Sequence, residues 1–247
     1  MGFARGQNNI GGQTSVQKAV SRIALEQETD LLIVAGDVSN DYRYTLDVLQ
    51  EIEHRTGKPC LFVPGNHDIW NIGRPLENAW SAYEALQRYD SNLTNAPYSL
   101  GPDWIVIGDI GWYDYSFGSS AFTGDDYGRM EYGGRVWKDK LYAKWDRDPV
   151  QVHELFYRRL QGQLERFKSK RIILVTHVVP HEHFIVPTPH PQWDYFNVFL
   201  GSRQYGELIE AYGGAVKYAV FGHVHYRKRA RLGEAEFVCG CLGDREE

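Results

Sequence analysis

Cys60-Leu61-Phe62-Val63-Pro64-Gly65-Asn66-His67-Asp68 joins an apolar run of strand length to a cluster of polar side chains. A short, uninterrupted apolar run is typical of a parallel strand that is covered on both faces. The polar cluster comes directly after it, and Gly65 allows the backbone to turn sharply where the strand ends. This stretch therefore predicts an α/β fold whose functional residues lie beyond the carboxyl ends of its strands.

The same pattern occurs three more times along the chain. The apolar runs 31–35, 171–175 and 216–221 are followed by Gly36-Asp37, Thr176-His177 and Gly222-His223-Val224-His225. Apolar residues at helical spacing separate the runs, for example Leu46, Leu49 and Ile52. Alternating strands and helices predict an α/β sandwich. Because ligands bind beyond the carboxyl ends of strands in such sheets, we expect the four polar clusters to converge on one edge.

The composition is that of an ordinary globular protein. The chain has 247 residues, of which 43% are hydrophobic and 24% are charged, and this length predicts one domain, 1–247. The formal net charge of -5 argues against nucleic-acid binding, which usually needs a basic face. No apolar stretch approaches the roughly 20 residues of a membrane span. Three cysteines suit a reducing compartment, so we expect a cytoplasmic protein.

Together the four clusters supply carboxylates, a side-chain amide and four imidazoles. This mixture favours a hydrolytic site for Zn, Mn or Fe over an all-oxygen site for Ca or Mg. Two such ions about 3.5–4 Å apart can hold the attacking and leaving oxygens of a phosphoryl group. Each cluster alone has an ordinary alternative, such as a turn or a hydrogen-bonded core histidine. All four in this order favour a metal centre.

The series Gly36-Asp37, Gly65-Asn66-His67-Asp68, His177 and Gly222-His223-Val224-His225 resembles the calcineurin-like metallophosphoesterase superfamily, from about residue 14 to the C-terminus. The segments 111–116 and 200–202 are further similar to a bacterial subgroup of phosphoesterases. The resemblance implies a four-layer αββα sandwich with mixed sheets. An aromatic-rich insertion at about 111–149 interrupts the alternation of elements, and it is either a cap on the substrate side or a packed surface excursion.

The resemblance also implies a ligand set for two divalent transition-metal ions, which would be Mn, Fe, Zn or Ni. Asp37 would bridge both ions, and the second ion would also bind Asn66, His177 and His223. His225 would bind the first ion.

The same resemblance implies the chemistry. His67 would stay off the metals, contact the phosphate and protonate the departing oxygen, and Asp68 would orient the His67 ring. The expected activity is hydrolysis of a phosphomonoester or phosphodiester bond in a small substrate by metal-bound hydroxide. Two alternatives remain open, a metal-depleted interaction scaffold of the same fold and a nuclease.

One element of the superfamily pattern is missing. The superfamily normally opens with a strand ending in Asp-x-His, but this sequence has no aspartate before Asp30 and no histidine before His54. The first ion would keep only Asp37 and His225, so we expect the second ion to be held more tightly. Truncation of the chain and loss of one metal site both explain the gap, and we favour truncation. Three further histidines, His181, His183 and His190, are expected to face solvent or form hydrogen bonds.

Overall fold

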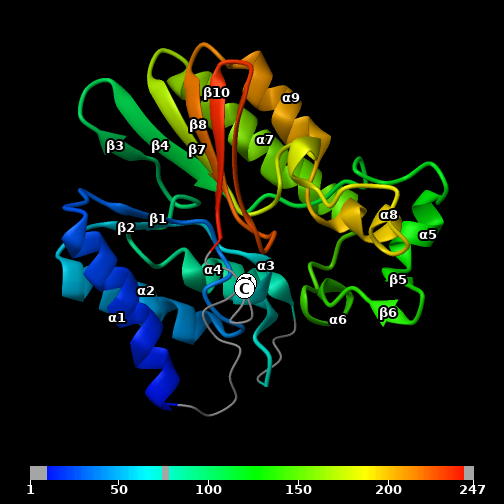
Figure 1. Cartoon of the computed structure of the whole chain (residues 1–247), viewed down its shortest axis with the longest axis horizontal. Helices are drawn as coiled ribbons and strands as arrows, with labels where there is room; N and C mark the ends of the chain where they lie inside the picture. The colour runs from blue at the N-terminus through cyan, green and yellow to red at the C-terminus, as the bar shows by residue number, and fades with distance from the viewer. Residues whose placement is uncertain (1–9, 74–77, 242–247) are drawn as a thin grey trace.

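Two stacked β-sheets lie between two layers of helices (Figure 1). The computed structural model describes residues 10–73 and 78–241, so parts of the predicted domain, including residues 1–9, lie outside the described residues. The predicted four-layer αββα arrangement with a mixed sheet is confirmed. None of the helices in the described ranges is both long and apolar enough to cross a membrane.

The smaller sheet has two parallel strands and is covered by helices on its outer face (Figure 1). Leu32 pairs with Cys60 and Val34 with Phe62, so the two strands end side by side. This sheet and its helices comprise α1 (Ile10–Glu26), β1 (Leu32–Val34), α2 (Tyr42–Thr56), β2 (Cys60–Phe62) and α4 (Ala79–Leu86).

The larger sheet has six strands in the order β3-β4-β7-β8-β10-β9. The strands β4, β7, β8 and β10 are parallel, whereas β3 and β9 are antiparallel edges. The strands are β3 (Tyr98–Leu100), β4 (Trp104–Asp109), β7 (Arg171–Thr176), β8 (Val216–Phe221), β9 (Arg227–Leu232) and β10 (Ala235–Gly240). The helices α7 (Pro149–Phe167) and α9 (Arg203–Ala211) cover its outer face (Figure 1).

Short elements fill the connections, and most belong to the aromatic-rich insertion or to the segment after β7. They are α3 (Asn66–Trp70), α5 (Gly124–Gly128), β5 (Glu131–Tyr132), β6 (Arg135–Val136), α6 (Asp139–Tyr142), η1 (Glu182–Phe184), α8 (Trp193–Phe196) and η2 (Asn197–Phe199). The antiparallel pair β5–β6 forms a small ribbon of its own.

Each interface between layers has its own apolar core. Between the two sheets, Val63 packs with Val106 and Val175, which explains why the strands appear as continuous apolar runs. Between the larger sheet and its helices, Leu160 of α7 packs in the cluster that includes Leu174 of β7. Burial on both faces fixes the sheets and places their carboxyl ends on a common edge.

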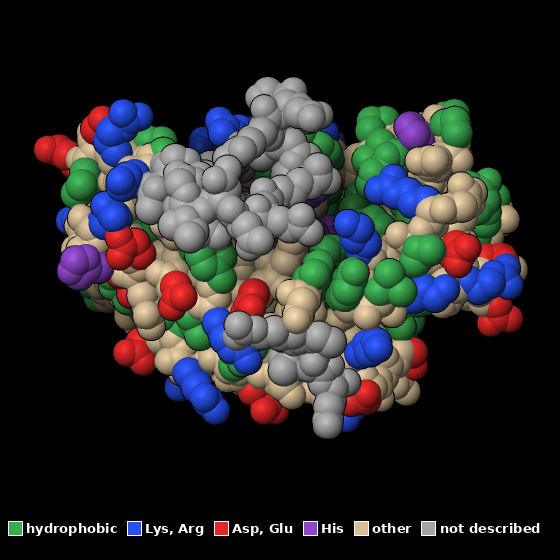
Figure 2. All heavy atoms as spheres, turned by 90° about the horizontal axis from the view of Figure 1, so that it is seen from below, with side chains coloured by type: hydrophobic (Ala, Val, Ile, Leu, Met, Phe, Trp, Pro, Cys, Tyr) green, Lys and Arg blue, Asp and Glu red, His purple; other side chains and the backbone are tan. Residues whose placement is uncertain are grey.

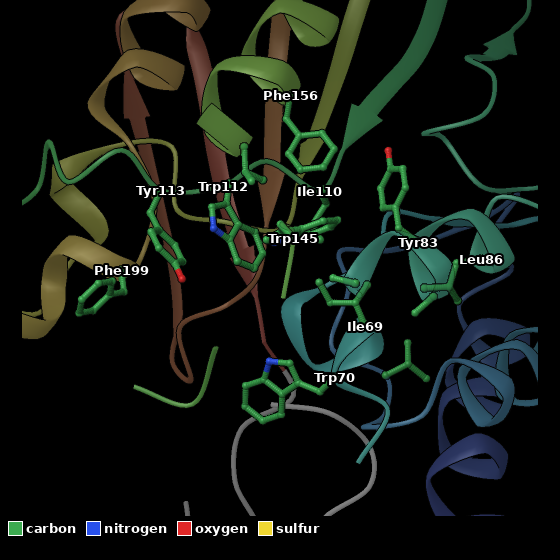
Figure 3. Close-up of a cluster of buried hydrophobic side chains, with 14 of the residues drawn as sticks. Ile69, Trp70, Tyr83, Leu86, Ile110, Trp112, Tyr113, Trp145, Phe156 and Phe199 are labelled. Atoms are coloured by element: carbon green, nitrogen blue, oxygen red, sulfur yellow. The ribbon is translucent and has the colours of Figure 1, made fainter. Parts of the chain in front are cut away.

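A third apolar core contains aromatic side chains of the insertion, so the insertion packs against the rest of the protein. Trp112 stacks on Tyr113 with ring centroids 4.9 Å apart and contacts Trp145 edge to face at 5.3 Å. Trp145 in turn contacts Phe156 of α7 at 5.6 Å, and Figure 3 shows these rings as one cluster. The aromatic side chains therefore tie the insertion to the framework.

Replacing Leu160 with alanine should lower the free energy of unfolding by about 2–5 kcal/mol, because a fully buried leucine would leave a cavity between α7 and the sheet. Urea denaturation followed by circular dichroism measures this loss. Leu141→Ala is the matched control, since Leu141 is 50% exposed and its replacement should change the free energy by less than about 0.5 kcal/mol. Equal effects at the two positions would contradict the packing.

Candidate metal centre

Four strand ends meet at the candidate site. Asp37 follows β1, Asn66 opens α3 just after β2, His177 follows β7 and His223 follows β8. All four side chains are buried. A possible ligand atom from each of Asp37, His177 and His223 lies within 4.8 Å of the others, so the structure brings these predicted residues together.

The ligand atoms lie at nearly the same separation from one another. His177 Nε2 is 2.9 Å from His223 Nδ1, 3.0 Å from Asn66 Oδ1 and 3.3 Å from Asp37 Oδ1. Asn66 Oδ1 is 3.1 Å from His223 Nδ1. Ligands placed about 2.0–2.2 Å from one transition-metal ion lie roughly 3 Å apart, which matches this cluster.

The outer partners of these side chains fix which atoms carry protons. His177 Nδ1 lies 2.8 Å from the Ala35 carbonyl, and His223 Nε2 lies 3.2 Å from the Phe199 carbonyl. A carbonyl can only accept, so each ring carries its proton on that outer nitrogen and turns a lone pair inward. Four acceptor atoms therefore face one another with no proton among them. We call this group the acceptor cluster, and its members are Asp37, Asn66, His177 and His223. Such a set fits a cation.

The electrostatics of the free centre agree with metal binding. Burial lowers the pKa of His177 and, with His177 as a neighbour, lowers the pKa of His223 well below the ordinary value. Burial would raise the pKa of Asp37, but the imidazoles of His177, His67 and His223 together outweigh it and lower that pKa. At neutral pH the centre thus offers neutral imidazoles and a carboxylate, the protonation states that bind metal.

The backbone at the centre adopts conformations that residues other than glycine rarely adopt. Asp37 has φ of 59° and His223 has φ of 68°, both in the left-handed region. Gly36, at φ of 82°, precedes Asp37, and a Cβ on Gly65 would lie only 2.2 Å from Asp37 Oδ1. Left-handed backbone costs of order 1–3 kcal/mol per residue and persists where the surroundings impose it. The two glycines allow the loops to approach closely enough to place Asp37.

Asp68 holds these loops together. Its carboxylate accepts hydrogen bonds from the backbone N–H groups of four residues and from the Thr45 hydroxyl, at 2.7–3.0 Å; the four are Asp37, Val38, Ser39 and Gly65. Burial raises the pKa of Asp68 to about 7, while the hydrogen bonds act to lower it. Asp68 thus joins the loop after β1 to the start of α3.

His67 is oriented by a residue that the sequence did not identify. The predicted partner was Asp68, and this prediction is wrong, because His67 Nδ1 lies 2.7 Å from Asn40 Oδ1. The His67 ring also stacks on Trp70 with centroids 3.7 Å apart. Its Nε2 is 4.0 Å from Asp37 Oδ2, beside the acceptor cluster but outside it. Consecutive helical residues point in different directions, which is why Asp68 cannot serve the ring that precedes it.

The remaining histidines lie outside the acceptor cluster. His225 lines the same cavity as Asp37 and His67, and its binding to a first ion stays a prediction. His181 Nδ1 accepts from the backbone of His183, and His190 Nδ1 accepts from the backbone of Trp193. His183 itself is exposed, so the expectation for this loop is confirmed.

Asp139, from the insertion, is a further part of the centre that the sequence did not reveal. It is 2% exposed, and its Oδ1 accepts from Asn66 Nδ2 at 2.9 Å and from Trp70 Nε1 at 2.6 Å. Its Oδ2 accepts from Trp137 Nε1 at 2.8 Å, and Tyr113 lies 3.4 Å away. Burial raises the pKa of Asp139 to about 6. The bond to Asn66 turns the amide oxygen of that residue toward the two histidines.

An open cavity of about 380 Å³ lies over the acceptor cluster. Its lining includes residues of the centre, among them Asp37, His67 and His223, and the segment 135–138 of the insertion. The insertion packs into the core and also lines this cavity, and its role as a cap on the substrate side stays a prediction.

Comparison with known proteins agrees with this geometry. A family model described as calcineurin-like phosphoesterase matches residues 9–227. The chain belongs to the calcineurin-like phosphoesterase family. Membership in this family and the shared α/β fold confirm the resemblance seen in the sequence.

Individual relatives are distant. The chain is 21% identical over 224 residues to a probable cyclic nucleotide phosphodiesterase of Coxiella burnetii, covering 89% of this chain and 69% of that protein. The crystal structure of phosphopantetheinyl hydrolase from Mycobacterium tuberculosis superimposes with a TM-score of 0.74 at 19% identity, covering 86% and 79% of the two chains. A dimetal phosphatase from Danio rerio gives a TM-score of 0.58 at 14% identity, with 96% and 83% covered. These structures share the fold.

Asp139→Asn should weaken binding of Mn²⁺ or Zn²⁺ by about 10–100-fold, a typical loss when the partner of a metal ligand is removed. An asparagine side chain has only one oxygen, so its NH₂ group would face donors on one of its two sides. These donors are either Asn66 Nδ2 and Trp70 Nε1, or Trp137 Nε1 and the Tyr113 hydroxyl. The Asn66 amide would then lose its partner or turn its oxygen away from the histidines.

Titration calorimetry with each ion measures the effect, and circular dichroism checks that the variant is folded. Asp125→Asn, at an exposed position in α5, is the matched control and should bind metal normally. Unchanged affinity in a folded Asp139→Asn protein would contradict the orienting role.

Proposed function

We propose that this chain hydrolyses a phosphate ester with divalent transition-metal ions held at the acceptor cluster. One observation carries the proposal: Asp37, Asn66, His177 and His223 turn unprotonated atoms toward one another beneath an open cavity. Asp37 and His225 would be the ligands of the first ion. Ions bound there would supply positive charge for a phosphoryl group and lower the pKa of a coordinated water.

His67 is the proton donor in this proposal. Its ring lies at the cavity wall, held between the Asn40 side chain and the face of Trp70. Burial lowers the pKa of His67 to about 4 in the free protein. A phosphate bound beside the ring would raise that pKa by its negative charge, so the imidazole would gain a proton together with the substrate. The proton would pass from the ring to the departing ester oxygen.

A small organic ester is the best substrate for the cavity. A volume of about 380 Å³ lies within the range of small-molecule sites. The face in Figure 2 mixes acidic and basic side chains, whereas a nucleic-acid track would need one sign to dominate. The similarity to a probable cyclic nucleotide phosphodiesterase supports a phosphodiester as well as a phosphomonoester substrate.

Activity should depend on added metal. With Mn²⁺ present, we expect hydrolysis of 4-nitrophenyl phosphate or of its bis-ester, and excess chelator should abolish it. His177→Ala removes an inward lone pair of the cluster, so it should reduce both Mn²⁺ affinity and turnover by more than the roughly 10–100-fold caused by loss of an outer partner.

His54→Ala, on the exposed end of α2, is the control and should retain both properties. A chain that binds Mn²⁺ normally after His177→Ala would exclude the proposed centre. A wild-type chain that binds Mn²⁺ but cleaves neither ester would favour the scaffold alternative.

Comparing turnover of substrates with different leaving groups separates the role of His67 from metal binding. His67→Ala should lower turnover by about 10²–10⁴-fold while leaving Mn²⁺ affinity unchanged. The loss should be larger for phenyl phosphate than for 4-nitrophenyl phosphate, because phenolate is a poorer leaving group and needs the proton more. An equal loss on both substrates would show that His67 binds the phosphate without donating a proton.

A further inference from the structure

Two basic side chains line the cavity together with residues of the acceptor cluster. Arg135 ends the turn of the β5–β6 ribbon, and Lys138 follows three residues later. Both line the cavity that also contains Asp37 and His67, and both are exposed. Their charges are additional to the positive charge that metal ions would bring to the cluster.

The described part of the chain neutralises neither cation. Across residues 10–73 and 78–241, no carboxylate pairs with Arg135 or Lys138. By contrast, Lys140 pairs with Glu131 at 3.6 Å, and Arg129 pairs with Asp126. Two positive charges without an ion-pair partner among the described residues thus line the cavity, which favours an anionic ligand there.

The Arg135 side chain is already positioned for such a ligand. Its guanidinium carbon lies 5.0 Å from the centroid of the Phe196 ring and 5.5 Å from that of Trp193. Cation–π contacts of this kind hold the guanidinium near the two rings. A guanidinium presented in this way suits two-point hydrogen bonding to a phosphate.

The backbone beneath these side chains is held firmly. Tyr132 pairs with Arg135 in the ribbon, and the Trp137 N–H donates to the Met130 carbonyl at 2.8 Å. The Trp137 ring stacks on Phe199 at 5.4 Å and lies 6.0 Å from the His223 ring. The indole of Trp137, which lies between the two cations in sequence, therefore reaches the edge of the acceptor cluster.

We propose that Arg135 and Lys138 bind a second phosphate of the substrate, so that the preferred substrates are diphosphate esters of a planar organic group, such as nucleoside diphosphates. This inference rests on the proposed function for the site of the first phosphate. The scissile phosphate occupies the metal side of the cavity, the second phosphate pairs with the cations, and Trp137 and Trp193 supply flat apolar surface for the organic group.

Binding of adenosine 5′-diphosphate and adenosine 5′-monophosphate tests this, because the two probes differ only in the second phosphate. Titration calorimetry on the Mn²⁺-loaded chain should give at least about tenfold tighter binding of the diphosphate, a difference typical of one charge-assisted phosphate contact. The double variant Arg135→Ala/Lys138→Ala should lose at least tenfold in affinity for the diphosphate and less than twofold for the monophosphate.

Lys140→Ala is the matched control, since Lys140 lies on the same segment, pairs with Glu131 and does not line the cavity. It should bind both probes as the wild type does. Equal wild-type affinity for the two probes, or an equal loss of both in the double variant, would overturn the proposal, because the cations would then have no second phosphate to bind. These readouts need no turnover, so they stand even if the chain cleaves neither nitrophenyl ester.

Discussion

The four acceptor atoms of the cluster meet at one edge of the sheets with no proton among them, so their lone pairs repel one another. The other residues of the site hold them in this arrangement. None of the four can easily turn away. The two imidazoles are fixed by the carbonyls of Ala35 and Phe199, and the Asn66 amide is fixed by Asp139. A cation is the species that converts their repulsion into attraction. Its binding energy would therefore also contribute to the stability of the folded chain.

The loops that carry these atoms depend on a second buried carboxylate. Asp68 gathers the N–H groups of the loop after β1 and of Gly65, and the Thr45 hydroxyl completes its shell. These bonds offset the cost of the left-handed backbone at Asp37. The strained backbone at Asp37 is thus stabilised by hydrogen bonds that its own N–H and those of the next two residues donate to Asp68.

The sequence was sufficient to predict the fold and the convergence of Asp37, His177 and His223, because the relevant signals are local. An apolar run followed by glycine and a polar side chain marks a strand end, and parallel strands bring such ends together. Asn40 and Asp139 carry no such signal. Asn40 precedes Asp41, which caps α2, so its sequence context indicates only a helix start. Asp139 is 73 residues from Asn66, and tertiary packing alone brings them into contact.

Asp139 also couples the cavity wall to the acceptor cluster. The insertion that carries Arg135 and Lys138 into the cavity also supplies the carboxylate that orients Asn66. Exchanging this loop for that of a relative would change the cavity wall and the support of the cluster together. A replacement loop would keep the Asn66 amide oriented only if it returned a buried acceptor to the place of Asp139.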